Sequence, residues 1–116
     1  MEKTLTIGGR QVQFKSTGAF LLRYKMQFGR DPIQDVFKMK DAIGVEDGKK
    51  VINVEVVDME IFFNLVWTLA KTADPAIPEP LEWLDSFDTF PLDYVLPELQ
   101  DLMLSSFVST VEPKKK

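Results

Sequence analysis

The sequence predicts an α+β fold in which an N-terminal β-hairpin packs on a bundle of four to five α-helices. An alternating segment about a Gly-Gly pair opens the chain, and apolar residues at helical spacing fill most of the remaining sequence. With 116 residues, of which 45% are hydrophobic and 11% aromatic, the chain is long enough for one domain with a hydrophobic core. We expect this domain to span residues 1–108, followed by a flexible tail over residues 109–116.

The opening segment TLTIGGRQVQF has the pattern of a β-hairpin. Gly8 and Gly9 can both adopt positive φ, which a two-residue type I′ turn requires. Pairing about that turn places Leu5 opposite Val12. One face of the hairpin then collects the apolar side chains of Leu5, Ile7, Val12 and Phe14. Because an isolated hairpin is only marginally stable in water, this face is expected to lie on helices.

A first helix is expected over residues 19–28. Ser16 or Thr17 can cap its N-terminus, and Gly29 is a suitable stop.

A second helix is predicted after the segment FGRDPIQD. Asp31 suits the N-cap, Pro32 the first helical position, and Gln34 completes a capping box. We expect the helix to end near Ile43 and Gly44. The apolar side chains that it is expected to present to the core are Ile33, Val36 and Phe37.

Residues 45–57 leave two interpretations open, a strand or a loop. Asp47 and Gly48 are typical of a turn, and residues 51–57 are rich in β-branched side chains. An extended conformation is expected here.

The strongest helix prediction is MEIFFNLVWTLAKTA, capped by Asp58. It is apolar nearly all round, so it is expected at the centre of the domain. It is too short to cross a bilayer.

Two further helices are predicted after the proline-rich connector DPAIPEP. The first starts at Pro80 and runs to about Phe87, and the second runs from near Pro91 to about Phe107. Pro97 removes one backbone donor from the second, so a kink or a restart is expected there. The leucines expected on the inward faces are Leu81, Leu84, Leu92, Leu96 and Leu99.

Composition excludes most catalytic chemistry. The chain has no cysteine and no histidine, which leaves no thiol nucleophile, no Ser-His-Asp triad and no zinc site of the usual kind. The acidic residues Glu82, Asp85, Asp88 and Asp93 lack the spacing of a calcium loop, and a solvated acidic face is the favoured interpretation. We therefore expect a protein that is not an enzyme and needs no metal or cofactor. With no signal-like segment and no cysteine, the cytoplasm is the expected compartment.

The net charge of −4 is distributed unevenly. Residues 1–71 carry eleven basic and nine acidic side chains, whereas residues 72–113 carry nine acidic side chains and no basic one. An acidic surface repels nucleic-acid phosphates and favours a basic partner. The terminal Lys114, Lys115 and Lys116 are too few to predict nucleic-acid binding. Neither nucleic acid nor a membrane is therefore an expected partner.

Four large rings lie within this acidic region, at Trp83, Phe87, Phe90 and Tyr94. Aromatic residues at helical spacing usually fill a core, and that interpretation stays open. However, Leu81, Trp83 and Leu84 cannot all point the same way on one helix. At least one ring is therefore expected to be exposed, and exposed rings beside Asp85 and Asp88 suit a protein-binding groove.

The order and wording of the segments resemble the tail assembly chaperones of long-tailed bacteriophages and prophages, particularly those of Gram-positive hosts. The resemblance spans nearly the whole chain. Its most specific pieces are FGRDPIQD and the block EWLDSFDTF…VLPEL, and a C-terminal lysine run closes it.

This resemblance implies a non-catalytic protein that binds the tape measure protein, keeps it soluble and helps recruit tail tube subunits. It implies a location in the host cytoplasm and absence from the finished virion. In such families a longer, frameshifted form contacts the tube protein, and the codons of Lys114–Lys116 are a candidate slip site. Self-association is a further expectation. A structural tail or head–tail joining protein, retained in the virion, is the alternative.

The residue pattern and the resemblance lead to one hypothesis for the mechanism. The C-terminal helices would bind amphipathic, partly basic helices of the partner in a groove. The expected anchors are the four rings, and Asp85 and Asp88 would steer the partner into place.

Overall fold

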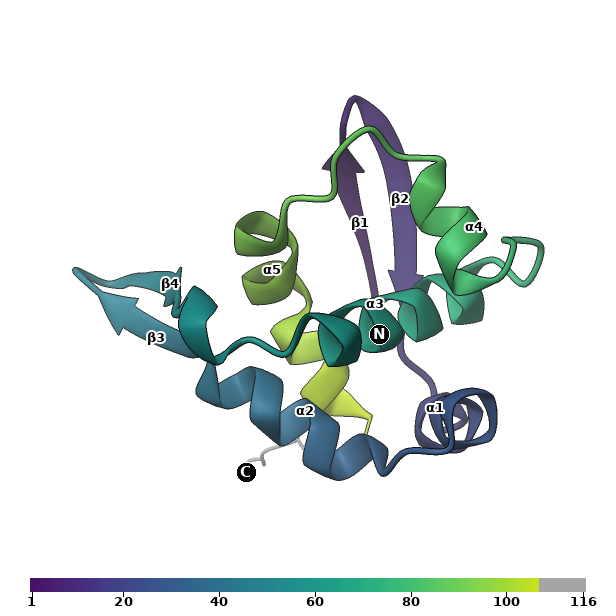
Figure 1. Ribbon diagram of the computed structural model, residues 1–116, viewed down its shortest axis with the longest axis horizontal. Helices are drawn as coiled ribbons and strands as arrows, with labels where there is room; N and C mark the ends of the chain where they lie inside the picture. The colour runs from purple at the N-terminus through teal and green to yellow at the C-terminus, as the bar shows by residue number, and fades with distance from the viewer. Residues whose placement is uncertain (107–116) are drawn as a thin grey trace, which may run out of the picture.

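The computed structural model describes residues 1–106 and confirms the α+β prediction (Figure 1). An N-terminal hairpin is followed by five α-helices and by a second, smaller hairpin that lies between the second and third of them. The predicted tail, residues 109–116, and Phe107 lie outside the described residues. The elements are β1 (Glu2–Ile7), β2 (Arg10–Lys15), α1 (Phe20–Phe28), α2 (Pro32–Asp41), β3 (Ile43–Glu46), β4 (Lys49–Ile52), the 3₁₀ turn η1 (Val54–Val56), α3 (Met59–Ala73), α4 (Pro80–Asp85) and α5 (Leu92–Ser105).

The β1–β2 hairpin forms as predicted. Gly8 and Gly9 have φ angles of 59° and 78°, and Leu5 pairs with Val12. Its apolar face is buried and packs mainly on α3. The predicted register is therefore confirmed, because the turn type and the apolar face specify the same pairing.

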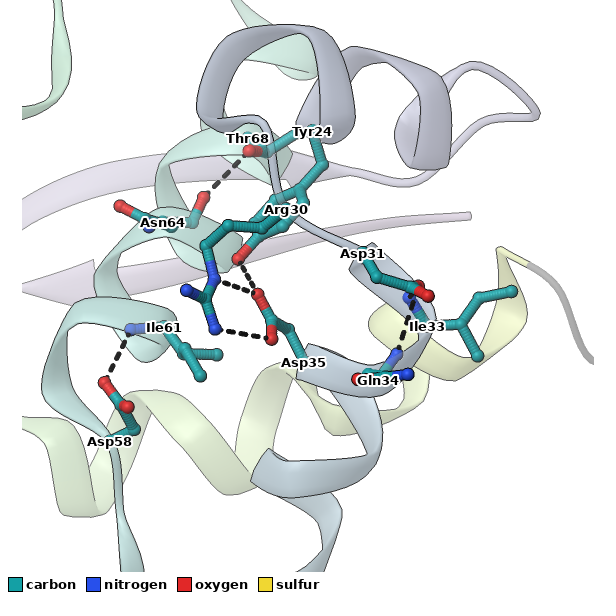
Figure 2. A network of polar contacts seen from close by, with 10 residues as sticks. All are labelled: Tyr24, Arg30, Asp31, Ile33, Gln34, Asp35, Asp58, Ile61, Asn64 and Thr68. Atoms are coloured by element: carbon teal, nitrogen blue, oxygen red, sulfur yellow. Dashed lines mark hydrogen bonds and ion pairs between the residues drawn. The ribbon is translucent and has the colours of Figure 1, made fainter.

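Helix α3 is the centre of the domain. It begins after Asp58, whose carboxylate accepts a hydrogen bond from the amide of Ile61 (Figure 2). It contacts β2, α1, α2, α4 and α5, which explains why its sequence is apolar nearly all round. Its buried side chains are Ile61, Phe62, Leu65, Val66, Trp67, Thr68, Leu69 and Ala70. Within residues 1–106, no helix is long and apolar enough to cross a membrane.

The predicted start of α1 needs correction. The N-cap position of α1 is Ala19 rather than Ser16 or Thr17, although the Thr17 hydroxyl accepts a hydrogen bond from the Ala19 amide (3.2 Å) just before the first turn. The end at Gly29, which is left-handed with φ 68°, is confirmed.

Helix α2 begins at Asp31 and Pro32 as predicted, but it ends earlier, at Asp41. It also turns a different face to the core. Ile33 and Phe37 are exposed, at 41% and 42% of their surface, whereas Pro32, Asp35, Val36 and Met39 are buried.

Residues 43–56 form a small hairpin and a 3₁₀ turn, so the expected extended conformation and the turn at Asp47 and Gly48 are confirmed up to Ile52, but residues 54–56 are helical. Asp47 and Gly48 make the turn of the hairpin, with φ angles of 51° and 77°. In Figure 1 the β3–β4 hairpin projects from one end of the molecule, while α1 and α4 lie at the opposite end.

Helices α4 and α5 also pack against α3. The connector before α4 is fixed to α3 by hydrogen bonds from Trp67 Nε1 to the Pro78 carbonyl (2.9 Å) and from Lys71 Nζ to the Ile77 carbonyl (2.8 Å). Helix α5 continues through Pro97, so the predicted restart does not occur. The side chains of Val95, Leu96, Leu99, Leu102 and Met103 form its buried seam.

Candidate functional site

The candidate site is the acidic C-terminal part of the chain, where eight acidic side chains and no basic one lie between Thr72 and Ser106. Some of these acids have partners within the domain. Glu98 forms an ion pair with Lys3 (2.8 Å), and Glu79 accepts a hydrogen bond from Gln27 (3.0 Å). Glu82, Asp85, Asp88, Asp93 and Asp101 are exposed.

Three of the four predicted anchor rings pack on one another instead of facing solvent. Trp83 is 2% exposed, and its ring centroid lies 5.1 Å from that of Phe87 and 5.6 Å from that of Phe90. Phe87 and Phe90 are 5.2 Å apart, and Phe90 also contacts Phe62 and Phe63 of α3. These near-perpendicular packings are typical of aromatic rings in a core. The cluster therefore attaches α4 and the following loop to α3.

Arg10 covers the outer side of this cluster. Its guanidinium carbon lies 4.1 Å from the centre of the Phe87 ring, and its Nη1 donates to the Ser86 hydroxyl at 2.9 Å. A cation over an aromatic face at this distance is attracted by the ring. The end of the first hairpin is thereby joined to the loop after α4. Phe87 is half-buried, with the Arg10 guanidinium over its ring.

Tyr94 is separate from the other rings and is 40% exposed. It lines a shallow groove of about 370 Å³ between α5, β1 and β4. Lys50 Nζ reaches across this groove to the Pro97 carbonyl at 3.3 Å. The remaining charged side chains that line the groove are Lys3, Lys49, Asp93, Glu98 and Asp101. The groove thus carries both signs of charge, so it is not the purely acidic surface that the sequence predicts around Tyr94.

An exposed apolar side chain does lie on α4, but it is a leucine and not one of the predicted rings. Leu81 is 75% exposed, whereas it was expected to face inward. Asp85 lies one turn after Leu81 on the same side of the helix, and the exposed Glu82 and Asp88 lie beside it in α4 and in the next loop. We call these four residues the α4 face. The prediction that Leu81, Trp83 and Leu84 cannot all point inward was right, but the exposed residue is Leu81.

The relative sizes of the side chains could have identified Leu81 from the sequence. When Leu81 and Trp83 compete for the buried side of a short helix, the larger indole gains more from burial. Asp85 lies one helical turn after Leu81 and shares its side. The predicted residues Asp85 and Asp88 therefore keep their exposed positions, but beside a leucine rather than beside exposed rings.

Within residues 1–106 one carboxylate is buried, and its contacts indicate that it stabilises the fold. Asp35 is 2% exposed and accepts hydrogen bonds from the Tyr24 hydroxyl (2.6 Å), Arg30 Nε (2.8 Å) and Arg30 Nη2 (3.1 Å) (Figure 2). Burial by itself raises the pKa of Asp35, but the hydrogen bonds from Arg30 and Tyr24 outweigh it and hold that pKa below its usual value. Burial, followed by the bond to Asp35, raises the pKa of Tyr24.

These contacts explain the structural role of the segment FGRDPIQD, which contains both Arg30 and Asp35. The arginine and the aspartate bind each other in two places, and the tyrosine joins them from α1 (Figure 2). We call Tyr24, Arg30 and Asp35 the α1–α2 corner. Every charge in it is paired, so the corner holds the two helices together.

No group of three or more acidic side chains in residues 1–106 is arranged to hold a metal ion. No family model, curated protein sequence or solved structure matches this chain. The resemblance to tail assembly chaperones therefore stays a prediction, and it depends on the sequence segments quoted for it.

Proposed function

We propose that this protein is a non-catalytic chaperone of phage tail assembly that binds the tape measure protein and keeps it soluble. The single observation that carries the proposal is the α4 face. There a leucine that is 75% exposed lies among carboxylates, in a region of the chain that has no basic side chain from Thr72 to Ser106.

The chemistry of the α4 face defines the segment that it binds. Leu81 offers apolar contact, which an amphipathic helix needs to cover its apolar stripe. Glu82, Asp85 and Asp88 offer negative charge, which attracts lysine and arginine and speeds the encounter. A tape measure protein is a long helical chain, so amphipathic segments with basic flanks are its expected contribution.

The anchors in this proposal differ from those expected from the sequence. Trp83 is buried, and Phe87 and Phe90 are held in the ring cluster, so these three rings position α4 rather than touch the partner. Leu81 takes the role of the apolar anchor. Tyr94 remains a candidate second contact, at the groove beside α5.

The test is co-purification of the cognate tape measure protein with a Leu81→Ser/Asp85→Asn variant. Both side chains are exposed, so the fold should be retained, and recovery of the partner should fall at least about tenfold, equivalent to about 1.4 kcal/mol. The matched control is Val45→Ser/Glu46→Gln, which removes one exposed apolar and one exposed acidic side chain at the opposite end of the molecule. Equal recovery with the two variants would refute the site.

The proposal places the protein in the host cytoplasm and leaves it out of the finished virion. A structural tail or head–tail joining protein is the alternative, and mass spectrometry of purified particles separates the two. Recruitment of the tail tube protein is assigned to a longer, frameshifted form. A gene sequence without a slip-prone run at the codons of Lys114–Lys116 would remove that part.

A further inference from the structure

A second exposed apolar surface lies on α1. Leu22 is 63% exposed and Met26 is 77% exposed, although most of the large apolar side chains of the domain are buried. They lie one helical turn apart on the side of α1 opposite to its buried residues, Phe20 and Tyr24. With Ala19, Arg23 and Gln27 they line a shallow depression of about 480 Å³.

The charged side chains of α1 itself are all positive, and the carboxylate of Glu79 lies at the edge of the depression, where it accepts a hydrogen bond from Gln27. Arg23 and Lys25 are exposed and stand on either side of the Leu22–Met26 stripe, and α1 contains no acidic residue. Neither side chain takes part in an ion pair described for residues 1–106. We call Leu22, Arg23, Lys25 and Met26 the α1 face.

The α1 face and the α4 face are complementary in chemistry. The α1 face has two exposed apolar side chains and the α4 face has one, each among charged side chains that are basic on α1 and acidic on α4. Helices α1 and α4 lie at the same end of the molecule (Figure 1), and the hydrogen bond from Gln27 to Glu79 joins the end of α1 to the N-cap of α4. The two faces are therefore neighbouring patches of opposite charge.

We propose that two copies of the chain associate through this end, with the α1 face of each copy packed on the α4 face of the other. Neighbouring patches of opposite sign are suited to a two-fold dimer, because one axis brings both complementary pairs together and the contact is made twice. Pairing α1 with α1, or α4 with α4, would oppose like charges, which is costly at an interface. The occupant of the exposed α1 face is thus a second copy of this chain.

This inference does not depend on the proposed function, and its test uses the chain alone. It has one consequence that does rest on that function. A dimer of this kind covers Leu81, so self-association and binding of a basic amphipathic segment exclude each other. The dimer would then be the resting form, and a tape measure segment would replace the α1 face of the second copy.

The experiment is a charge swap, followed by analytical ultracentrifugation. One variant, Arg23→Glu/Lys25→Glu, has an acidic α1 face, and the other, Glu82→Lys/Asp85→Lys, has a basic α4 face. Each variant alone opposes like charges, so its dimer dissociation constant should rise at least tenfold above that of the wild type. Mixed in equal amounts, the two variants present opposite charges at both contacts and should form a one-to-one heterodimer.

A matched control changes two lysines outside the α1 face, at Lys38→Glu/Lys40→Glu on α2, and should dimerise like the wild type. Leu22→Ser/Met26→Ser gives a second route to the monomer without any change of charge. Circular dichroism establishes that each variant is folded. A wild type that stays monomeric at about 1 mM, where even contacts of about 4 kcal/mol are half-formed, overturns the proposal. A mixture that stays monomeric overturns it as well.

Discussion

The α1–α2 corner and the α4 face use charge in opposite ways. In the corner, Asp35 is buried and accepts three hydrogen bonds from Tyr24 and Arg30. On the α4 face, Glu82 and Asp85 are exposed, and no ion pair is described for them within residues 1–106. A buried charge is retained only where partners replace its lost hydration, whereas an exposed charge costs little and stays available for another molecule.

This difference separates residues that specify the fold from residues that offer a surface. The corner belongs to the segment FGRDPIQD and joins α1 to α2. The α4 face belongs to the block EWLDSFDTF and the leucine just before it, and the rings of that block fix α4 to α3 and thereby leave Leu81 outside. Both segments carry the resemblance to tail assembly chaperones, but only the second carries the proposed docking surface.

The largest expected effect comes from breaking the corner. Asp35→Ala leaves the Tyr24 hydroxyl without its acceptor and Arg30 without its counter-charge, so the free energy of unfolding should fall by about 3 kcal/mol. Urea denaturation measures this change. Asp41→Ala, at an exposed position of the same helix, is the control and should change stability by less than about 0.5 kcal/mol. Similar losses in the two variants would contradict the assigned role.

A second effect is the dependence of stability on pH. Because the folded-state pKa of Asp35 is lowered, its contribution to stability is fully present above the unfolded-state value of about 3.9 and is lost as the pH falls through the lower folded value. We expect the wild type to lose stability below about pH 4. Asp35→Asn should lose less over the same range, since that contribution is missing at every pH. Parallel pH profiles of the two proteins would count against the ion pair.

The smallest expected effect on stability is at the α4 face. Glu82→Gln/Asp85→Asn removes two exposed charges and should change the free energy of unfolding by less than about 0.5 kcal/mol. The same variant should dissociate the proposed dimer, because it removes the attraction to Arg23 and Lys25. Thermal unfolding and ultracentrifugation of one sample provide both measurements. A large loss of stability would mean that these carboxylates serve the fold after all.

The parts of the fold that were predictable are those in which local chemistry and the apolar pattern agree. Gly8-Gly9 specified the turn and the register of the first hairpin, and Asp31 and Asp58 specified helix starts. At these positions the turn or cap residue and the neighbouring apolar side chains demand the same backbone.

The inward face of α2 was not predictable from apolar spacing. Apolar spacing turns Ile33 and Phe37 inward, but the buried ion pair requires Asp35 on the inner side. A prediction from apolar spacing places carboxylates in solvent. It does not take into account that Arg30, five positions earlier, pairs with Asp35 and allows its burial.

For the candidate site, the exposure of the acidic residues was predictable, whereas the exposed apolar side chain was not the one expected. Asp85 and Asp88 are exposed as expected, whereas Trp83 and Leu81 exchanged roles. The relative sizes of Trp83 and Leu81 did indicate which of the two is buried. The packing of Phe90 on Phe62 and Phe63, which come from a distant part of the chain, depends on the tertiary fold and leaves no local signal in the sequence.

The central claim is that the α4 face binds a basic amphipathic helix while the corner only supports the fold. Its most direct test is a nitrogen–proton NMR spectrum of the labelled chain, recorded while a helical segment of the cognate tape measure protein is added. We predict that the amide signals of residues 81–88 shift most and that those of Arg30 and Asp35 stay in place. Shifts centred on the corner, or on the β3–β4 hairpin, with the α4 signals unchanged, would contradict the claim.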